Sequence, residues 1–265
     1  MIQFIVFSRA RPLQLHGYLT SLYKQCSGDF TVSVLVKVDE PYREAYDEVS
    51  DEFVDAFPFL TETDFAADLN EILYDAEFTC FGCDDVVFVE PIVVSDIDYS
   101  FKTAPPLLGF SLRLGENVTE DMFGNPLSQP VDCGDWDFTA PGSVGDWAYP
   151  WEVLGTVYRT EFVREMVAAL MPGSPRQLEE HGSRIWAQHT DLRHMAAYPT
   201  SRLVVPTVNL VQQEYPNGIK GSKPLSPEFL LECWHQGLRL DVERYAGMAP
   251  PSWRVGEFYL KRCLS

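Results

Sequence analysis

The sequence of 265 residues contains no long apolar segment. No uncharged apolar run approaches the ~18–20 residues that a membrane-spanning helix needs. The first seven residues are apolar apart from Gln3, but they lack the basic region and the small-residue cleavage site of a secretory signal peptide. We therefore expect a cytoplasmic protein without a membrane span, in which residues 2–7 form the first strand.

Cysteine is also scarce, with six residues in the whole chain. Cys80 and Cys83 have the spacing of a C-x-x-C pair, but they lie in an apolar, strand-like segment and no second close pair accompanies them. A structural zinc site normally needs two such pairs, and a disulfide framework needs more cysteines in a shorter chain. The cysteines are therefore expected to be buried thiols.

Positive charge is sparse as well, with 20 Lys and Arg against 39 Asp and Glu and a net charge of −19. Such a surface repels polyphosphate backbones, which argues against a nucleic-acid partner. A phosphorylated ligand would need local compensation from a few arginines or from a divalent cation. The sequence also lacks the glycine-rich dinucleotide fingerprint and the G-x-x-x-x-G-K-[ST] loop, which argues against NAD binding and P-loop phosphoryl transfer.

Strand and helix patterns alternate over the first hundred residues. Runs rich in β-branched or aromatic residues predict strands, and apolar residues at helical spacing predict helices. The strands are expected at 2–7, 31–38 and 77–83, and the helices from Pro12 to Cys26, from Tyr42 to Phe53 and around 64–76. This order predicts an α/β fold with a Rossmann-like, mostly parallel central sheet flanked by helices.

The second half of the chain is less regular. Its predicted elements are a strand at 107–114, a loop at 115–147, a helix at 161–171 capped by Thr160, a polar helix at 176–194, a strand at 202–211 interrupted by Pro206, and a helix from Ser226 to Gly237. No repeat, low-complexity tract or linker divides the chain. We therefore predict a single domain over residues 1–265.

Two adjacent carboxylates follow the predicted strand at 77–83. Asp84 and Asp85 repel each other, and a hard divalent cation, Mn²⁺ or Mg²⁺, would offset their charge by taking oxygen ligands. Such a cation can bridge a diphosphate and stabilise it as a leaving group. The alternative is a solvated turn in which an aspartate caps the next element.

Polar residues also follow the first two predicted strands, at the edge of the sheet where ligands bind. Arg9 and Arg11 lie beside Ser8 and next to a helix N-terminus, where they can hold phosphate or stack on a base. The alternative is pairing with nearby carboxylates. Asp39 can accept hydrogen bonds from a base or a ribose hydroxyl, or it can cap the helix that starts after Pro41.

The segment Phe7–Leu15, Asp39 and the segment Asp84–Phe88 together resemble a GT-A-fold glycosyltransferase of the family-2-like kind, in an uncharacterised bacterial branch. The resemblance is clear over residues 1–100 and looser beyond. It implies a nucleotide-sugar-binding half at 1–100 and an acceptor-side half at 101–265.

The resemblance also implies roles for particular residues. In this family the end of the first strand and an aspartate after the second strand hold the nucleotide of a sugar donor, and an Asp-x-Asp motif holds a metal on the diphosphate. The residues implied for the nucleotide are Ser8, Arg9, Arg11, Asp39 and Asp84. The residues implied for the metal are Asp84 and Asp85.

The chain departs from the family pattern at two places. Gly82 stands at the first acidic position of the Asp-x-Asp motif if Asp84 is the second, so the metal would be held by Asp84, Asp85 or both, with help from a later histidine. Candidates for that histidine are His181, His189 and His194. Where related proteins carry Asp-Gly-His, this chain reads Leu154-Gly155-Thr156.

An inverting sugar transfer needs a carboxylate beside the acceptor hydroxyl. Asp146 and Glu152 are the predicted catalytic bases, because they lie within or after the aromatic loop. Glu179 and Glu180 are interpreted as a polar helix face. Four aromatic residues of this region either stack on sugar faces or belong to the core: Trp136, Trp147, Tyr149 and Trp151.

The favoured hypothesis is a metal-dependent glycosyltransferase that moves a sugar from a UDP- or GDP-sugar to a hydroxyl acceptor, such as a glycan or a cell-surface polysaccharide precursor. The first alternative is a catalytically altered binding or scaffold protein. The second is a nucleotidyltransferase that makes sugar nucleotides. Such enzymes carry a glycine-rich loop after the first strand, whereas residues 8–16 contain no glycine.

Overall fold

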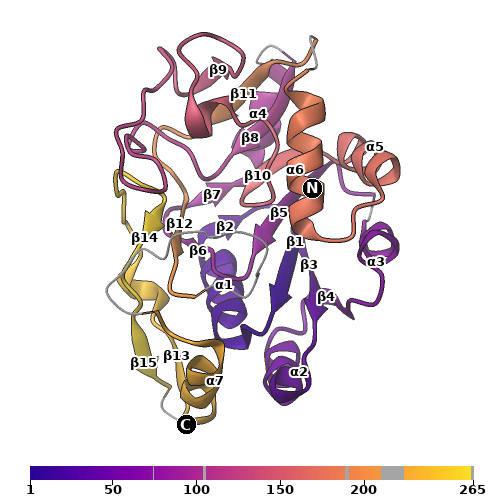
Figure 1. Ribbon diagram of the computed structural model, residues 1–265, viewed down its shortest axis with the longest axis vertical. Coiled ribbons are helices and arrows are strands. Elements are labelled where there is room, and N and C mark those ends of the chain that lie inside the picture. Colours follow the sequence, from indigo (N-terminus) through magenta and orange to yellow (C-terminus); the bar gives the residue numbers. More distant parts are fainter. Residues whose placement is uncertain (74, 104–105, 189–190, 210–223, 264–265) are drawn as a thin grey trace.

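The computed structural model describes residues 1–73, 75–103, 106–188, 191–209 and 224–263. Its centre is an eight-stranded sheet surrounded by helices (Figure 1). In spatial order the strands are β4 (Ala56–Thr61), β3 (Phe30–Lys37), β1 (Ile2–Arg9), β5 (Phe78–Cys83), β10 (Thr156–Arg159), β8 (Leu107–Ser111), β11 (His194–Ala197) and β9 (Asp135–Asp137).

The sheet is mostly parallel, as predicted. Strand β1 pairs in parallel with β3 and β5, and β3 pairs in parallel with β4. Strand β10 runs antiparallel to both β5 and β8, β11 is parallel to β8, and β9 is an antiparallel edge strand. The carboxyl ends of β1, β3 and β5 therefore lie at the same edge of the sheet.

Strand β1 lies at the centre of the parallel part and is buried along most of its length. Every residue from Ile2 to Ser8 is buried, because helices and loops cover both faces of the sheet. The polar member of this run, Gln3, donates from its amide to the hydroxyl of Ser33 on β3 and to the carbonyl of Ile72. These bonds satisfy an amide that would otherwise be costly to bury.

Seven α-helices occur in the described ranges: α1 (Pro12–Gln25), α2 (Arg43–Glu52), α3 (Phe65–Ile72), α4 (Val94–Thr103), α5 (Thr160–Leu170), α6 (Pro175–Trp186) and α7 (Pro227–His235). Helix α1 packs against α2 and α7, and α5 packs against α3 and α6. None of the helices described is long and apolar enough to cross a membrane.

Three small sheets complete the fold. The first joins β14 (Arg254–Val255), β12 (Leu203–Pro206) and β6 (Val87–Phe88). The others pair β13 (Leu238–Leu240) with β15 (Leu260–Arg262), and β2 (Cys26–Ser27) with β7 (Ile92–Val93). Strand β6 begins two residues after Asp85. The first small sheet therefore brings β14, from late in the sequence, close to the acidic pair.

Several predicted boundaries differ from the structure in the first half. Strand β4, an edge strand whose third residue is Pro58, was not predicted from the sequence pattern. Proline is tolerated at sheet edges because its missing N–H does not interrupt a central ladder. In place of the helix predicted from Tyr42 to Phe53, the structure has a 3₁₀ turn (Glu40–Tyr42) followed by α2.

The second half differs more, because short strands there carry little periodic signal. The polar helix predicted to reach 194 ends at Trp186, and His194 instead opens β11. The loop at 115–147 contains β9 and a 3₁₀ turn (Gly145–Ala148). The strand predicted at 202–211 is β12, which ends at Pro206, and residues 210 and 211 lie outside the described residues.

The predicted helix cap at 160 is displaced by one residue. Thr160 is the first residue of α5, with Arg159 at the N-cap, and the Thr160 hydroxyl lies 2.9 Å from the Thr79 hydroxyl instead of capping. Ser226 is an N-cap as predicted, and its hydroxyl accepts from the Phe229 N–H.

Gly82 in β5 is explained by close packing between the sheet and α1. A Cβ at this position would collide with the hydroxyl of Tyr18 on α1 and would lie 2.6 Å from that ring's Cε2 atom. Tyr18 is fully buried and has no room to move aside. An acidic side chain at the first Asp-x-Asp position is therefore incompatible with this packing.

We expect Gly82→Ala to lower the free energy of unfolding by about 1–3 kcal/mol, because the added methyl group overpacks the contact with Tyr18. Gly142→Ala is the matched control, because a Cβ at position 142 would meet nothing within 4 Å. Urea unfolding of both variants measures the difference. Equal stability of the two variants would contradict this account of Gly82.

Candidate functional site

A cleft of about 1090 Å³ opens at the carboxyl ends of β1, β3 and β5. Its walls come from widely separated parts of the chain: the strand ends, the loop around Phe123, the start of α6 and the segment that enters β14. Ligands of parallel sheets bind at this edge. The cleft is therefore the candidate functional site.

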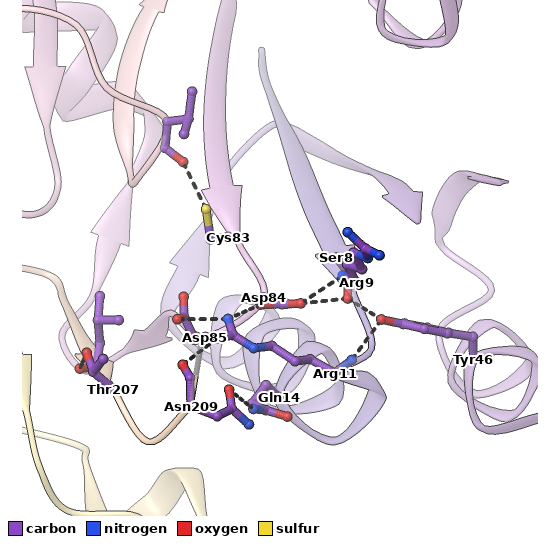
Figure 2. Close-up of polar contacts among 12 residues, drawn as sticks. Ser8, Arg9, Arg11, Gln14, Tyr46, Cys83, Asp84, Asp85, Thr207 and Asn209 are labelled. Atoms are coloured by element: carbon purple, nitrogen blue, oxygen red, sulfur yellow. Dashed lines mark hydrogen bonds and ion pairs between the residues drawn. The ribbon is translucent and has the colours of Figure 1, made fainter. Parts of the chain in front are cut away.

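A buried arginine organises the floor of the cleft (Figure 2). Arg11 is 6% exposed, and its Nη1 atom donates to Asp84 Oδ1 and to Asp85 Oδ2, each at 3.0 Å. Its Nη2 atom donates to the Asn209 carbonyl at 2.6 Å. Burial acts to lower the pKa of Arg11, but attraction from Asp84 and Asp85 outweighs it and raises the pKa.

Asp84 is tied equally firmly to the first turn of the chain. Its Oδ2 atom accepts from the Ser8 hydroxyl at 2.8 Å and from the Arg9 N–H at 3.2 Å. The Ser8 hydroxyl also lies 2.7 Å from the Tyr46 hydroxyl, which accepts from the Arg11 N–H. Asp84 therefore fixes the turn between β1 and α1 from both sides, and Figure 2 shows this chain of contacts.

The structure brings the predicted nucleotide-side residues together at one edge of the sheet. Ser8, Arg11 and Asp84 are buried and bonded to one another, whereas Arg9 and Asp39 are half-exposed and lie 3.4 Å apart, from Nε to Oδ2. Asp39 occupies the N-cap position of the 3₁₀ turn, but its side chain makes no capping hydrogen bond. The carboxylate is thus directed to Arg9 and not to the helix.

The acidic pair does not present the ligands that a divalent cation needs. Both oxygens of Asp84 already accept hydrogen bonds, and one oxygen of Asp85 accepts from Arg11. Within the described ranges, no three His, Cys, Asp or Glu side chains form a group that could hold a metal ion. The side chains present therefore do not fit a cation held by Asp84.

The candidate histidines lie elsewhere or outside the described residues. His194 on β11 has its Nδ1 atom 2.8 Å from Asp135 Oδ1, on the far side of the sheet from β1. His181 lies on α6 and is not among the residues that line the cleft. His189 falls in a segment that the structure does not describe.

A second buried arginine lies among the cleft residues that come from the second half of the chain. Arg113 is 3% exposed; its Nη1 atom donates to Asp146 Oδ1 at 2.7 Å and its Nε atom to Glu152 Oε2 at 2.5 Å. The indole of Trp253 donates to the other Asp146 oxygen, and the Thr156 hydroxyl donates to the other Glu152 oxygen. Both predicted catalytic bases are therefore engaged through both of their oxygens.

These contacts set the protonation of the two carboxyls. Burial acts to raise the pKa of Asp146, but Arg113 and Trp253 outweigh it and hold the pKa below its usual range. Burial raises the pKa of Glu152, against the opposing attraction of Arg113. Asp146 is consequently a weak proton acceptor.

Glu179 is a cleft residue that the sequence analysis interpreted only as part of a polar helix face. It lies on α6, and burial together with the neighbouring Glu152 charge raises its pKa to about 7, while a hydrogen bond with Tyr149 opposes the shift. A signal for it was present in the sequence. Gly182 and Trp186, both buried, follow it at helical spacing and place it on the inward face.

The aromatic residues divide between the core and the cleft. Trp136, Trp147 and Trp151 are buried and belong to the core. Tyr149 is 36% exposed, Phe123 is 66% exposed, and both line the cleft. Phe123 was not predicted, because a single aromatic residue in a long loop has no periodic context.

Gly155, the position at which residues 154–156 agree with Asp-Gly-His, has a structural role. Gly155 has a φ of 93°, its N–H donates to the Phe81 carbonyl, and its carbonyl accepts from the Leu112 N–H. A side chain there would collide with Leu203 and adopt an unfavourable backbone conformation. Gly155 thus links β5 to the segment that follows β8. Its neighbour Leu154 lines the cleft.

The two members of the acidic pair are expected to differ in their effect on stability. Asp84→Ala should lower the free energy of unfolding by about 3–5 kcal/mol, because it leaves the buried Arg11 without its main partner. Asp85→Ala should cost about 1–2 kcal/mol, the value of one charge-assisted hydrogen bond. Urea unfolding at neutral pH measures both, and equal losses would contradict the central role of Asp84.

No protein-family model matches the sequence. Among curated proteins, the chain is similar to the bifunctional glycosyltransferase pgtA of Dictyostelium discoideum, with 23% identity over 285 residues. The match covers 92% of this chain and 36% of that protein. The chain therefore spans only about a third of the length of its curated relative.

Two solved structures have a similar fold. TarS from S. aureus superimposes with a TM-score of 0.52 and 14% identity, over 76% of this chain and 36% of TarS. A shorter form of TarS, 1–349, gives a TM-score of 0.50 and 13% identity over 76% of this chain and 59% of that form. At such low identity these structures bear on the fold alone. The chain is thus similar in sequence to one glycosyltransferase, and it has a GT-A-like fold with a mostly parallel central sheet and flanking helices.

Proposed function

We propose that the chain is a glycosyltransferase that binds a UDP- or GDP-sugar in the cleft and transfers the sugar to a hydroxyl group of an acceptor. One observation carries the proposal. In a GT-A-like fold, cationic side chains at the strand ends share a cleft with Glu179, a carboxyl group whose pKa is about 7. The cationic side chains supply a site for a diphosphate, and Glu179 supplies a proton acceptor.

The donor is proposed to bind on the side formed by residues 1–100. Arg9 and Lys37 end β1 and β3, are half-exposed, and line the cleft. Their positive charge is local compensation for a phosphate ligand in a chain of net charge −19. Asp39, beside Arg9, is proposed to accept from a ribose hydroxyl or a base N–H, while Ser8 positions the turn that carries Arg9.

The acceptor is proposed to bind on the side formed by residues 101–265. Phe123 and Tyr149 present exposed aromatic surface to the cleft. Aromatic rings stack on the apolar C–H faces of sugars and leave the hydroxyls available for hydrogen bonds. A hydroxyl-bearing sugar chain therefore fits this wall.

Glu179 is proposed as the base of the transfer. The acceptor oxygen forms a bond with the anomeric carbon of the donor, the bond from that carbon to the diphosphate oxygen breaks, and Glu179 takes the hydroxyl proton. A carboxyl with a pKa near neutral is well suited to this step. Asp146 and Glu152, the bases expected from the sequence, are proposed instead to hold Arg113 in place, because each accepts from it.

Glu179→Gln is expected to lower the turnover number at least a hundredfold, because the amide cannot accept the proton. Binding of the nucleoside diphosphate should change little, because Glu179 lies on the acceptor side. The control is Glu180→Gln, because Glu180 is not among the cleft residues and forms an ion pair with Arg184. The assay measures diphosphate release from UDP- and GDP-hexoses with hexose acceptors, and equal rates for both variants would exclude Glu179 as the base.

The pH dependence of the native chain tests the same role. A base must be deprotonated to act, so kcat/KM is expected to rise with pH through about 7, the pKa of Glu179. The rise should be absent in Glu179→Gln. A profile that is flat between pH 6 and 8 in the native chain would contradict the assignment, and binding of a diphosphate without any turnover would favour a binding protein.

A further inference from the structure

We infer that the cleft binds its nucleoside diphosphate without a divalent cation, because Arg11 and Arg254 supply the positive charge beside Asp84 and Asp85. This inference rests on the proposed function, since it concerns the same diphosphate site. It reverses the metal dependence that the resemblance implies. Four contacts of the acidic pair carry it, together with the small sheet that places Arg254.

The first step concerns Asp84, whose carboxylate has no oxygen available for a metal. Oδ1 accepts from Arg11, and Oδ2 accepts from Ser8 and from the Arg9 N–H. A divalent cation takes carboxylate oxygens directly as ligands. Coordination by Asp84 would therefore break buried hydrogen bonds that hold the turn after β1, and the carboxylate is only 3% exposed.

The second step concerns Asp85, which is bonded to the guanidinium of Arg11 and interacts electrostatically with that of Arg254. Its Oδ2 atom accepts from Arg11 at 3.0 Å. Arg254 lies close enough that attraction from Asp85 opposes the effect of burial, which lowers the Arg254 pKa. Two carboxylates and two guanidinium groups carry no net charge together. A divalent cation added to this neutral group would meet repulsion from both arginines.

The third step is topological. Strand β6 follows Asp85, pairs with β12, and β12 pairs in parallel with β14, where Val205 lies opposite Arg254. This three-stranded sheet places Arg254 in the lining of the cleft, although Arg254 is far from Asp85 in the sequence. Its guanidinium also stacks on the Trp253 ring, with the Cζ atom 5.0 Å from the ring centroid. The cation is therefore positioned by the fold.

The two arginines are inferred to act differently. Arg11 is buried and committed to Asp84, Asp85 and the Asn209 carbonyl, so it neutralises the floor of the cleft. Arg254 is partly exposed and lines the cleft. A guanidinium group binds phosphate oxygens through two parallel hydrogen bonds. Arg254 is thus the group that contacts the diphosphate, where the resemblance would place a metal.

Calorimetric titration of the whole chain with UDP, GDP, CDP and dTDP, each with EDTA and with MnCl₂, tests this inference. We expect one diphosphate to bind with a Kd that differs less than about threefold between the two buffers. Binding that requires MnCl₂ would overturn the inference and still support the proposed function. Failure of all four diphosphates to bind in either buffer would overturn the proposed function, and this inference with it.

A titration with MnCl₂ alone gives a reading that does not depend on any nucleotide. We expect the native chain and Asp85→Asn to take up Mn²⁺ equally, since the acidic pair is not a metal site. Acidic residues elsewhere contribute the same background to both proteins. A Mn²⁺ site that is present in the native chain and absent from Asp85→Asn would overturn the inference.

Arg254→Gln tests the proposed contact directly. In EDTA it should weaken diphosphate binding at least tenfold, the scale of one lost charge-assisted hydrogen bond, while Arg254→Lys retains part of the affinity. Arg262→Gln is the matched control, because Arg262 is exposed on β15 and is not among the cleft residues. Unchanged affinity in Arg254→Gln, with thermal unfolding like that of the control, would overturn the role of Arg254.

Discussion

The buried ion pair between Arg11 and the two carboxylates of Asp84 and Asp85 is the interaction on which the rest of the site depends. Removing charges from water costs several kcal/mol each, and the cost is recovered only where the partners and their hydrogen bonds are complete. Here the pair joins the turn after β1, the end of β5 and the carbonyl of Asn209. Three segments that are distant in sequence are thereby held in one place, and together they form the floor of the cleft.

The same arrangement occurs twice. Arg11 lies between the carboxylates of Asp84 and Asp85, and Arg113 lies between those of Asp146 and Glu152. In each case an arginine neutralises carboxylates that the sequence suggested as metal ligands or catalytic bases. The contacts of these carboxylates instead hold the residues around the cleft in place. For Glu179 the balance is different: burial and the neighbouring Glu152 charge outweigh the attraction of Arg113, and the pKa rises to about 7. An overall charge of −19 thus coexists with a cleft in which four carboxylates, those of Asp84, Asp85, Asp146 and Glu152, are paired with arginines.

The sequence predicted the parallel half of the fold well and the other half poorly, for a physical reason. Strands β1, β3 and β5 and helix α1 have long apolar patterns, because each is buried against the same core, and such patterns are local. Strand β4 contains a proline at an edge, and β9 and β11 have three and four residues, too few for a period to be recognised. The candidate site followed the same division. Ser8, Arg9, Asp84 and Asp85 line the cleft at the predicted strand ends, whereas the sequence did not single out Glu179, Phe123 or Arg254 as cleft residues.

The sequence by itself determined where the strands of the first half end and which polar side chains follow them, because hydrophobic periodicity and turn residues act over a few neighbouring positions. Only the tertiary structure decided the state of those side chains. Arg11 and the carbonyl it binds are 198 positions apart, and Arg113 and Glu152 are 39 apart. No local pattern encodes such contacts, since they arise when the sheet closes and charged groups must find partners away from water. The same carboxylates that suggest a metal site in the sequence are, in the folded chain, the partners of an arginine.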